Sequence, residues 1–561
     1  MTIDEFYRMG HGYRETLQRF TTEIFVCGSG GCAACGAGTI RKRLESICSA
    51  RGVSSSIRIV QTGCIGFCSE GPLVRIHPSD EIFTHVSPDD AEHIIERCLT
   101  NARKPHDTTH AADIPFFTRQ HRIVLRNAGL IDPESVTDYI GHGGYEALAK
   151  AISYIPPEGV ILELRSSRLR DRGGNGSPVG LTWGIVARAK AERKYVVCNA
   201  DKGDPGAFVD RGILEGDPHK VLEGMAIAGY AVGAEQGYIY IRGDHRQAIE
   251  RVRKAIDQAE RRQLLGNRIF DSSFNFRIDI RKGAGTSVCG DETALIASIE
   301  GARSEPRPSS WLASQCGLWG KPTLVSDVEN FANIPSIILH GGKWFASIGT
   351  EKCSGTKVFW LAGFTRHGGL IEVPMGIPLR DIVYDIGGGI RKGEFKAVHA
   401  GGPFGGCIPA QHLDTPVDFD SFAQLGAAIG SGGLVVLDDS VCMVDLARHY
   451  SAYFMNECCG KCTPCRVGTH QLHAILDRMT SGNADTADFA TLEELCDMLK
   501  DTSLCGLGQS APNSVLGSLH FFRKEYEDHI HRRLCPAGSC RMQSPMAASP
   551  RQVKREPRRK G

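Results

Sequence analysis

The sequence has almost no net charge, no long apolar run and no signal-peptide pattern in its first residues. Among its 561 residues, 65 Lys and Arg stand against 64 Asp and Glu, which gives a net charge of +1. Proteins that grip nucleic acid need a basic face, so this balance argues against nucleic acid as a partner. No stretch approaches the roughly 20 apolar residues of a membrane helix, and the opening MTIDEFYRMG lacks the basic and apolar layout of a signal peptide. We therefore expect a cytoplasmic protein without direct membrane insertion.

Cysteine, by contrast, is abundant. The chain contains 21 cysteines, and several are grouped at short spacings. A reducing cytoplasm disfavours disulfides, so this usage indicates metal or iron-sulfur ligation. The length predicts roughly three to five globular domains, each large enough for its own core.

The densest group is Cys459-Gly-Lys-Cys462-Thr-Pro-Cys465, with a remote partner at Cys505. Three thiolates at this spacing can wrap one cubane while a distant fourth closes it, so the pattern favours a 4Fe-4S cluster. Tetrahedral zinc is the alternative, although zinc sites usually pair their ligands two and two. Cys458 directly precedes a ligand, and we expect it to pack rather than bind.

Two further pairs, Cys27-x4-Cys32 and Cys64-x3-Cys68, each follow an expected strand. Two loops that each bring two thiolates suit a 2Fe-2S cluster, with one pair for each iron. A zinc site is again the alternative. Cys35 is a spare cysteine that we expect to follow its loop into a helix.

A third group combines Cys442 with His529, Cys535 and Cys540. Three thiolates and one imidazole would make a Cys3His zinc site that ties the end of the helical region to its beginning. Packing without a metal explains these residues equally well. Cysteines scattered singly, such as Cys198, are expected in the core.

Hydrophobic periodicity predicts a multidomain α/β protein with a helical end. Strands alternate with helices in the first half, short strands broken by glycine turns follow, and apolar residues then recur at three- and four-residue intervals. The regions are a small α/β unit (24–100), a polar linker (100–115), a large α/β unit (146–345), a β-rich unit (354–440), a helical bundle (443–531) and a disordered basic tail (543–561).

The Gly-rich segment LRDRGGNGSPVGLTW, residues 169–183, could close backbone N–H groups on a phosphate. It becomes specific together with YVVCNADKGDPGAFVDRGILEGDPHKV, VCGDETALIASIEG, KPTLVSDVENFANIP and ECCGKCTPCRVG. The combination resembles the NADH-oxidising flavoprotein subunit of respiratory complex I, and more narrowly its counterparts in NAD-linked bifurcating hydrogenases and formate dehydrogenases. The resemblance runs from about Thr22 to Met542.

The resemblance implies a domain order. The expected domains are a thioredoxin-like 2Fe-2S domain (1–100), a linker and lead-in (101–145), a Rossmann-like FMN and NADH domain (146–350), a β-grasp domain (351–440), a helical bundle with a 4Fe-4S cluster (441–542) and the basic tail (543–561).

The resemblance also implies a flavin site, a reaction and partners. Asp204 takes the place of an acidic residue that faces nicotinamide. The expected chemistry is hydride transfer from NADH to the flavin, followed by single-electron transfer to the clusters. The partners would be NAD(P)H, another iron-sulfur subunit and a catalytic subunit, with the choice between NAD and NADP left open. The residues expected to hold FMN are Arg172, Gly173, Gly174, Gly176, Asn199, Asp201, Gly290, Asp291 and Glu292.

The chain departs from the family pattern around the flavin loop. The family's glycine before the loop arginine is Asp171 here, and the glutamate after Asn-Ala-Asp is Lys202. Asp171 adds a repulsive charge, which is partly offset if Lys202 pairs with it. The other departures are Thr182 for the loop lysine, Ser326 and Asp327 for an Asn pair, and Ser177, Ile185 and Leu312 at the adenine-stacking positions, with Trp311 one residue from the last.

Two functions follow from these observations. The chain is either an NAD(P)H-oxidising flavoprotein subunit with an altered pocket, or an electron relay that keeps its clusters and has lost NADH binding, with or without FMN. A scaffold without redox chemistry would leave the cysteine groups unexplained.

Overall fold

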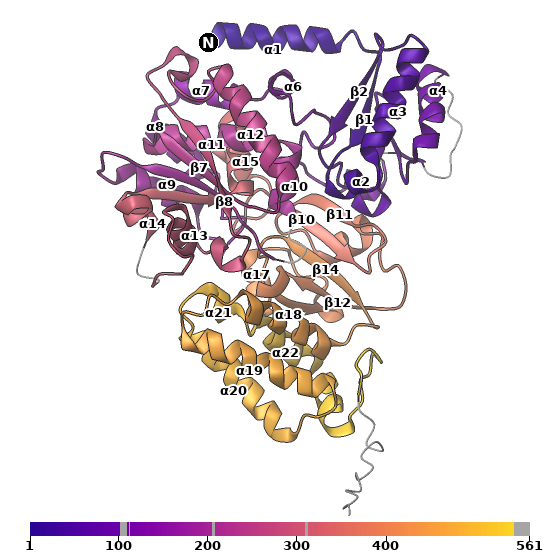
Figure 1. The fold of residues 1–561 in the computed structure, drawn as a ribbon, viewed down its shortest axis with the longest axis vertical. Coiled ribbons are helices and arrows are strands. Elements are labelled where there is room, and N and C mark those ends of the chain that lie inside the picture. Colours follow the sequence, from indigo (N-terminus) through magenta and orange to yellow (C-terminus); the bar gives the residue numbers. More distant parts are fainter. Residues whose placement is uncertain (101–108, 112, 175, 205–207, 309–311, 543–561) are drawn as a thin grey trace, which may run out of the picture.

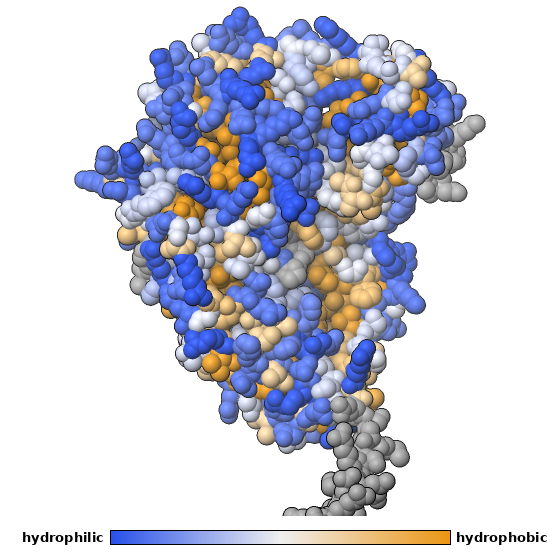
Figure 2. Space-filling model, in the orientation of Figure 1, coloured by the Kyte–Doolittle hydropathy of each residue, from blue (hydrophilic) through white to orange (hydrophobic). Residues whose placement is uncertain are grey.

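The computed structural model describes residues 1–100, 109–111, 113–174, 176–204, 208–308 and 312–542 (Figure 1). The N-terminal sheet and the large α/β unit lie side by side at one end of the molecule, a mixed sheet lies in the middle, and a helical bundle forms the other end. Hydrophilic residues cover most of the face shown in Figure 2, with apolar patches over the α/β unit and over the region of the mixed sheet. Within the described residues, no helix is both long and apolar enough to span a bilayer.

The N-terminal sheet has the strand order β2-β1-β3-β4-β5. β1 pairs in parallel with β2 and antiparallel with β3, and α3 buries Ile40, Leu44 and Ile47 at helical spacing. Part of the expected linker completes this sheet, because β5 pairs with β4. The elements are α1 (Ile3–Leu17), β1 (Thr22–Cys27), α2 (Gly30–Ala34), α3 (Ala37–Ala50), β2 (Ile57–Thr62), β3 (Val74–His77), β4 (Glu81–Phe83), α4 (Ala91–Thr100) and β5 (Thr109–Ala111).

The large α/β unit is built on the parallel sheet β8-β7-β6-β9. Parallel strands are covered on both faces, and β6 and α11 are accordingly almost wholly buried. In such sheets ligands bind beyond the carboxyl ends of the strands. The helix α5 (Pro115–Thr118) precedes this unit and packs in the core of the other two sheets. The elements of the α/β unit are α6 (Val136–Gly141), α7 (Glu146–Tyr154), α8 (Pro157–Ser166), α9 (Val179–Arg188), β6 (Tyr195–Ala200), α10 (Val209–Gly216), α11 (Pro218–Val232), β7 (Gln236–Arg242), α12 (Arg246–Arg261), β8 (Arg277–Gly283), α13 (Glu292–Ile299), α14 (Ala313–Cys316), β9 (Thr323–Asp327), α15 (Val328–His340) and α16 (Gly342–Ala346).

The middle unit is a mixed sheet with the order β11-β10-β14-β12-β13. Its buried face shares one hydrophobic core with the N-terminal sheet, and Leu370 N donates to Gly66 O at 2.9 Å across the junction. The elements are β10 (Thr356–Gly363), β11 (Gly369–Pro374), β12 (Phe395–Ala400), β13 (Gly406–Pro409), α17 (Phe419–Gln424) and β14 (Gly433–Asp438).

The C-terminal bundle packs around the apolar stripe that its periodicity predicts. Leu472, Ile475, Leu476 and Met479 of α19 are all buried. The helices are α18 (Met443–Glu457), α19 (Thr463–Thr480), α20 (Thr486–Thr502), α21 (Gly506–Ser510) and α22 (Asn513–Glu527). The three sheets and the helical end confirm the predicted fold class.

Candidate functional site

The two N-terminal cysteine pairs meet at one edge of the first sheet. Cys27 ends β1 and Cys32 lies in α2, while Cys64 follows β2 and Cys68 opens a short 3₁₀ turn. Because β1 and β2 are parallel, both loops leave the same edge, and all four cysteines line one cavity of about 450 Å³. The Sγ atoms of Cys64 and Cys68 lie 3.3 Å apart. Hydrogen bonds from the thiols of Cys32 and Cys64 lower the pKa of Cys27, and the same contacts raise the pKa of Cys32 and of Cys64, so the three thiols lie close enough to share protons.

The C-terminal cysteine run faces the α/β unit. Cys465 lies in the first turn of α19, and Cys505 directly precedes α21. Both pack in one apolar cluster with Cys459 and Cys462. Arg303 Nη2 donates to the carbonyl of Cys459 at 3.0 Å, which fixes this loop against the α/β unit. The fold therefore brings together the four residues predicted to hold the 4Fe-4S cluster.

Cys458 lies inside the same group. Its Sγ is 3.3 Å from Sγ of Cys465 and accepts a hydrogen bond from the backbone N–H of Gly460 at 3.4 Å. Five thiols thus surround the site. The role of Cys458 as a packing residue stays a prediction.

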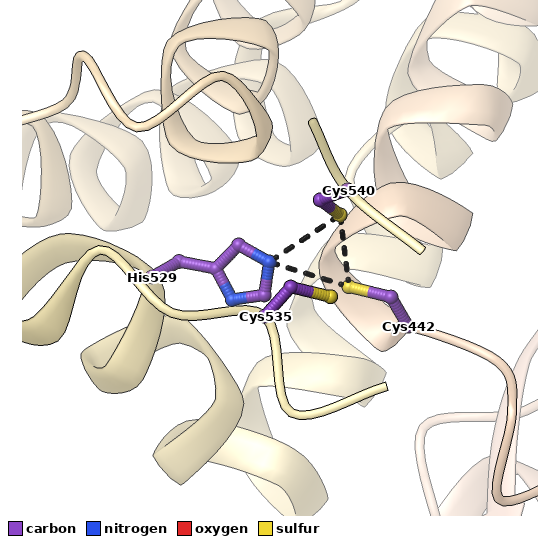
Figure 3. Close-up of side chains that lie close together, drawn as sticks. All are labelled: Cys442, His529, Cys535 and Cys540. Carbon is purple, nitrogen blue, oxygen red and sulfur yellow. Dashed lines mark hydrogen bonds between the residues drawn. The ribbon is translucent and has the colours of Figure 1, made fainter. Parts of the chain in front are cut away.

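The third group closes into a compact set of four ligand atoms (Figure 3). Nε2 of His529 lies 3.4 Å from Sγ of Cys442 and 3.4 Å from Sγ of Cys540, and these two sulfurs are 3.5 Å apart. All four ligand atoms, Cys535 included, lie within 4.8 Å of one another. Tetrahedral zinc with Zn–S of about 2.3 Å places its ligand atoms roughly 3.5–3.8 Å apart, which agrees with these distances. Nδ1 of His529 is 2.6 Å from the carbonyl of Glu525, an orientation that leaves Nε2 for a metal.

A second cavity, of about 530 Å³, lies beyond the carboxyl end of β6. Gly173 and Gly174 of the Gly-rich loop form one wall, and the 3₁₀ turn Ser287–Gly290 forms another. The mixed sheet contributes Ile429–Ser431, and α21 with Asn513 contributes the bundle's side. The large α/β unit, the mixed-sheet unit and the helical bundle thus meet around this cavity.

Two acidic side chains predicted from the sequence face this cavity. Both carboxylate oxygens of Asp201 are buried and have no hydrogen-bond partner among the described residues, and burial raises the pKa of Asp201 to about 7. Asp204 accepts a hydrogen bond from the Ser431 hydroxyl, and burial raises its pKa as well. An unpartnered buried carboxyl is costly, so Asp201 marks a position where a ligand would supply the hydrogen-bonding partner.

Three other predicted residues, Asn199, Asp291 and Glu292, have different positions relative to the cavity. Asn199 donates to the carbonyl of Gly290 at 3.1 Å and accepts from the N–H of Asp201 at 3.2 Å, so it joins β6 to the turn that precedes α13. Asp291 lines the cavity and caps α13 through the N–H of Thr293 at 2.9 Å. Glu292 is exposed in the first turn of that helix.

Arg172 lies with its side chain away from the cavity. Its Nε donates to the carbonyl of Thr356 at 2.9 Å, its Nη2 donates to the carbonyl of Ser354, and its backbone N–H donates to Asn330 at 2.9 Å. It therefore anchors the glycine loop to β10. Gly176 has φ of +73° and packs on the ring of Phe419, which itself lines the cavity.

Asp171 and Lys202, two residues that differ from the family pattern, lie close to Asp327 beside the glycine loop. Lys202 Nζ pairs with Asp327 at 2.9 Å and donates to the carbonyl of Gly173 at 3.1 Å. Burial alone would lower the pKa of Lys202, but the Asp327 carboxylate raises it. Asp171 accepts from Asn330, and burial followed by the Asp327 carboxylate raises its pKa to about 7. Lys202 thus forms its ion pair with Asp327 and not with Asp171, and Asp171 binds a proton more readily than an ordinary aspartate.

The adenine-stacking positions lie outside the cavity walls. Ser177, Ile185 and Leu312 are exposed, and Trp311 lies outside the described residues. Sequence reasoning missed the Ile429–Ser431 wall, although the run Ile-Gly-Ser-Gly-Gly before β14 resembles the other glycine turns of the chain. It also missed Arg211, which lines the first cysteine cavity and for which spacing offers no signal.

Comparison with known proteins agrees with this geometry. Three family models match the chain: the thioredoxin-like 2Fe-2S ferredoxin over residues 3–99, the Nuo51 FMN-binding domain over 164–336, and the NADH-ubiquinone oxidoreductase-F iron-sulfur binding region over 445–529. The NADP-reducing hydrogenase subunit HndC of Solidesulfovibrio fructosivorans is 52% identical, over 75% of this chain and 86% of the relative. An F-type subunit of NADH-quinone oxidoreductase in Rhizobium meliloti is 42% identical, over 74% of this chain and 99% of the relative.

The chain belongs to the family of F-type subunits of NADH-quinone oxidoreductases. A solved NAD+-reducing NiFe-hydrogenase in its H2-reduced state is similar at 25% identity, with a TM-score of 0.65 and coverage of 94% of this chain and 88% of that chain. The residues present fit the cofactors of this family. A glycine-walled cavity with an orphaned Asp201 suits FMN, and two sets of four cysteines suit the two clusters.

Proposed function

We propose that this chain oxidises NADH or NADPH as one subunit of a larger oxidoreductase and passes the electrons to two iron-sulfur clusters. The observation that carries this proposal is that one helix, α21, both lines the flavin cavity and follows a cysteine of the 4Fe-4S set. Gly506, Leu507 and Ser510 of α21 line the flavin cavity, and Cys505 directly precedes this helix. Cys459, Cys462, Cys465 and Cys505 would therefore hold a 4Fe-4S cluster next to the wall of the cavity that would hold the flavin.

The chain's own residues prepare this cavity for a flavin and a nicotinamide. Glycines at 173 and 174 leave backbone groups accessible, and Asp201 offers an unpartnered carboxyl. Phe404 and Ile429 contribute apolar surface that excludes water. When bound, FMN takes a hydride from reduced nicotinamide and releases its electrons singly. Asp204, held by Ser431, is the acidic group that would face the nicotinamide.

An anaerobic visible spectrum tests this function. The purified chain is reconstituted with iron, sulfide and FMN, and NADH or NADPH is added in parallel samples. Bleaching of the flavin and cluster bands by either nucleotide supports the proposal and identifies the preferred donor. Bands that dithionite reduces while both nucleotides leave them unchanged would overturn it in favour of an electron relay.

The same proposal places the chain in a cytoplasmic complex with another iron-sulfur subunit and a catalytic subunit. Its relatives are named as subunits of a hydrogenase and of a quinone oxidoreductase. Native mass spectrometry of the tagged chain from its own cells would show a heteromeric mass that includes an iron-containing partner. A chain that stays alone at every salt concentration would contradict the complex.

We further propose that Cys442, His529, Cys535 and Cys540 bind one structural zinc ion. The near-tetrahedral spacing of their ligand atoms supports a closed site, which would join the start of α18 to the end of the bundle. Metal analysis of the reconstituted chain should find one zinc besides the iron. X-ray absorption at the zinc edge should show three sulfur neighbours and one nitrogen, and a chain that binds no zinc would refute this site.

A further inference from the structure

Helix α10 lies between the flavin cavity and the cavity of the N-terminal cysteines. It begins shortly after Asp204, which lines the first cavity, while its Arg211 and Glu215 line the second. In Figure 1 this helix lies at the junction of the α/β unit and the N-terminal domain, next to α2. Within the described residues, Arg211 and Glu215 are the charged side chains of the cysteine cavity. They are therefore the charged side chains nearest to a cluster bound there, apart from its own cysteine ligands.

Arg211 is held in place against the loop that joins Cys27 to Cys32. Its Nε pairs with Oε1 of Glu215 at 2.7 Å. Oε2 of Glu215 accepts from the hydroxyl of Ser29 at 2.9 Å, and Glu215 is only 1% exposed. The guanidinium lies directly against Gly30, because a Cβ built on that glycine would meet Nη2, Cζ and Nη1 of Arg211.

The second cysteine loop rests on the same helix. A Cβ on Gly63 would collide with the backbone of Gly216, the last residue of α10, so only glycine allows this approach. Gln247 of α12 also donates to the carbonyl of Gly28 at 2.8 Å. Both loops that carry the cysteines are thus fixed on α10 and α12 of the α/β unit, and the position of Arg211 is not left to a flexible surface.

Within the described part of the chain, two nitrogen atoms of the Arg211 guanidinium are free to donate hydrogen bonds to a ligand. Nε is engaged by Glu215, and the structure shows no acceptor for Nη1 or Nη2 among the described residues. Reduction adds one negative charge to a cluster, and the reduction potential depends on nearby charge and on hydrogen bonds to the sulfurs. A cation in the cavity wall stabilises the reduced form, whereas an unbalanced Glu215 carboxylate would oppose it.

We propose that Arg211 keeps the N-terminal 2Fe-2S cluster reducible by offsetting Glu215 and placing its free guanidinium donors in the cluster cavity. Arg211 is a positioning and tuning residue, and the inference rests on the assignment of Cys27, Cys32, Cys64 and Cys68 to that cluster. Removing the guanidinium removes a cation and also leaves a buried carboxylate without its partner. Both changes make the cluster harder to reduce.

A redox titration followed by EPR tests this role on the full reconstituted chain, at a temperature where the 2Fe-2S signal is observed separately from the 4Fe-4S signal. In Arg211→Gln the ratio of reduced to oxidised cluster at a fixed potential should fall about ten-fold, which corresponds to about 59 mV for one electron. Arg211→Lys, which keeps the charge, should restore most of that ratio. Glu215→Gln should move the ratio in the opposite direction, which a merely structural role of the pair would not produce.

The outcomes distinguish a failure of the 2Fe-2S cluster assignment from a failure of the role proposed for Arg211. If the unchanged chain shows no 2Fe-2S signal, the cluster assignment fails and the proposal with it. If the signal is present and the potential is the same in Arg211→Gln, the role of Arg211 alone is refuted. Should Arg211→Gln not fold, the Glu215→Gln and Arg211→Lys variants still decide, because an unchanged potential in Glu215→Gln contradicts the proposed charge balance.

Discussion

Asp171 provides a direct test of the altered flavin loop through the replacement Asp171→Asn. The variant keeps the shape of the side chain, and its amide oxygen can still accept the hydrogen bond from Asn330. It removes the charge that burial and Asp327 disfavour, the same causes that raise the pKa of Asp171 to about 7. The pKa of Asp171 is about 7 in the folded chain and has the ordinary value of 3.8 in the unfolded chain. Between pH 3.8 and pH 7 the folded chain therefore binds more protons than the unfolded chain. Stability should therefore fall as the pH rises through this window and level off above about pH 7.

The size of this effect follows from linkage. Each pKa unit corresponds to about 1.36 kcal/mol, so the interval from about pH 5.5 to pH 7 is worth up to about 2 kcal/mol. Asp171 keeps some contact with solvent, so about 1–2 kcal/mol is the expected range. For a unit of this size, that corresponds to roughly 2–8 °C in Tm.

The assay compares thermal unfolding of wild-type and Asp171→Asn chains, both reconstituted with clusters and free of flavin, at several values of pH. The advantage of the variant should grow by this amount from about pH 5.5 to pH 8. Asp420→Asn is a matched control. Asp420 is exposed, and its Oδ2 lies 3.1 Å from Nη1 of Arg170, the residue before Asp171. Its effect should not change with pH. A difference between Asp171→Asn and wild type that is flat with pH would refute the raised pKa.

Three further expectations concern the redox and metal sites. Asp204→Asn should lower kcat for NADH oxidation about ten-fold or more while FMN content stays constant, and an unchanged kcat would remove Asp204 from the nicotinamide site. Cys505→Ser should abolish the 4Fe-4S EPR signal whereas Cys458→Ser keeps it, and loss of the signal in both variants would make Cys458 a ligand. Cys535→Ser should lose zinc and lower the Tm of the bundle, whereas Cys496→Ala, a buried cysteine of the same bundle, should cost about 1–3 kcal/mol and retain zinc. Equal zinc content in these last two variants would contradict the Cys3His site.

Much of the architecture could be predicted because its signals are local. The strand-and-helix alternation, the glycine turns and the stripe from Leu472 to Met479 all reflect spacings within one segment. The segment Thr109–Ala111 is predicted as linker, since three polar and small residues carry no strand signal of their own. It pairs only because β4 offers an open edge. The N-terminal helix α1 likewise gains its place from a distant contact, where Phe6 packs on Phe270 with ring centroids 5.3 Å apart.

The sequence by itself limited each cysteine group to an iron-sulfur cluster or zinc and favoured the cluster, because the spacing of Cys27 and Cys32, or of Cys459 to Cys465, limits which centre the thiolates can wrap. Only the tertiary structure decided how the centres are joined. It brought α21 to the flavin cavity, turned Lys202 toward Asp327, and set Arg211 against the first cluster loop. These are contacts between residues far apart in the chain, and they depend on how whole domains pack. The spacing of residues within one segment does not specify that packing.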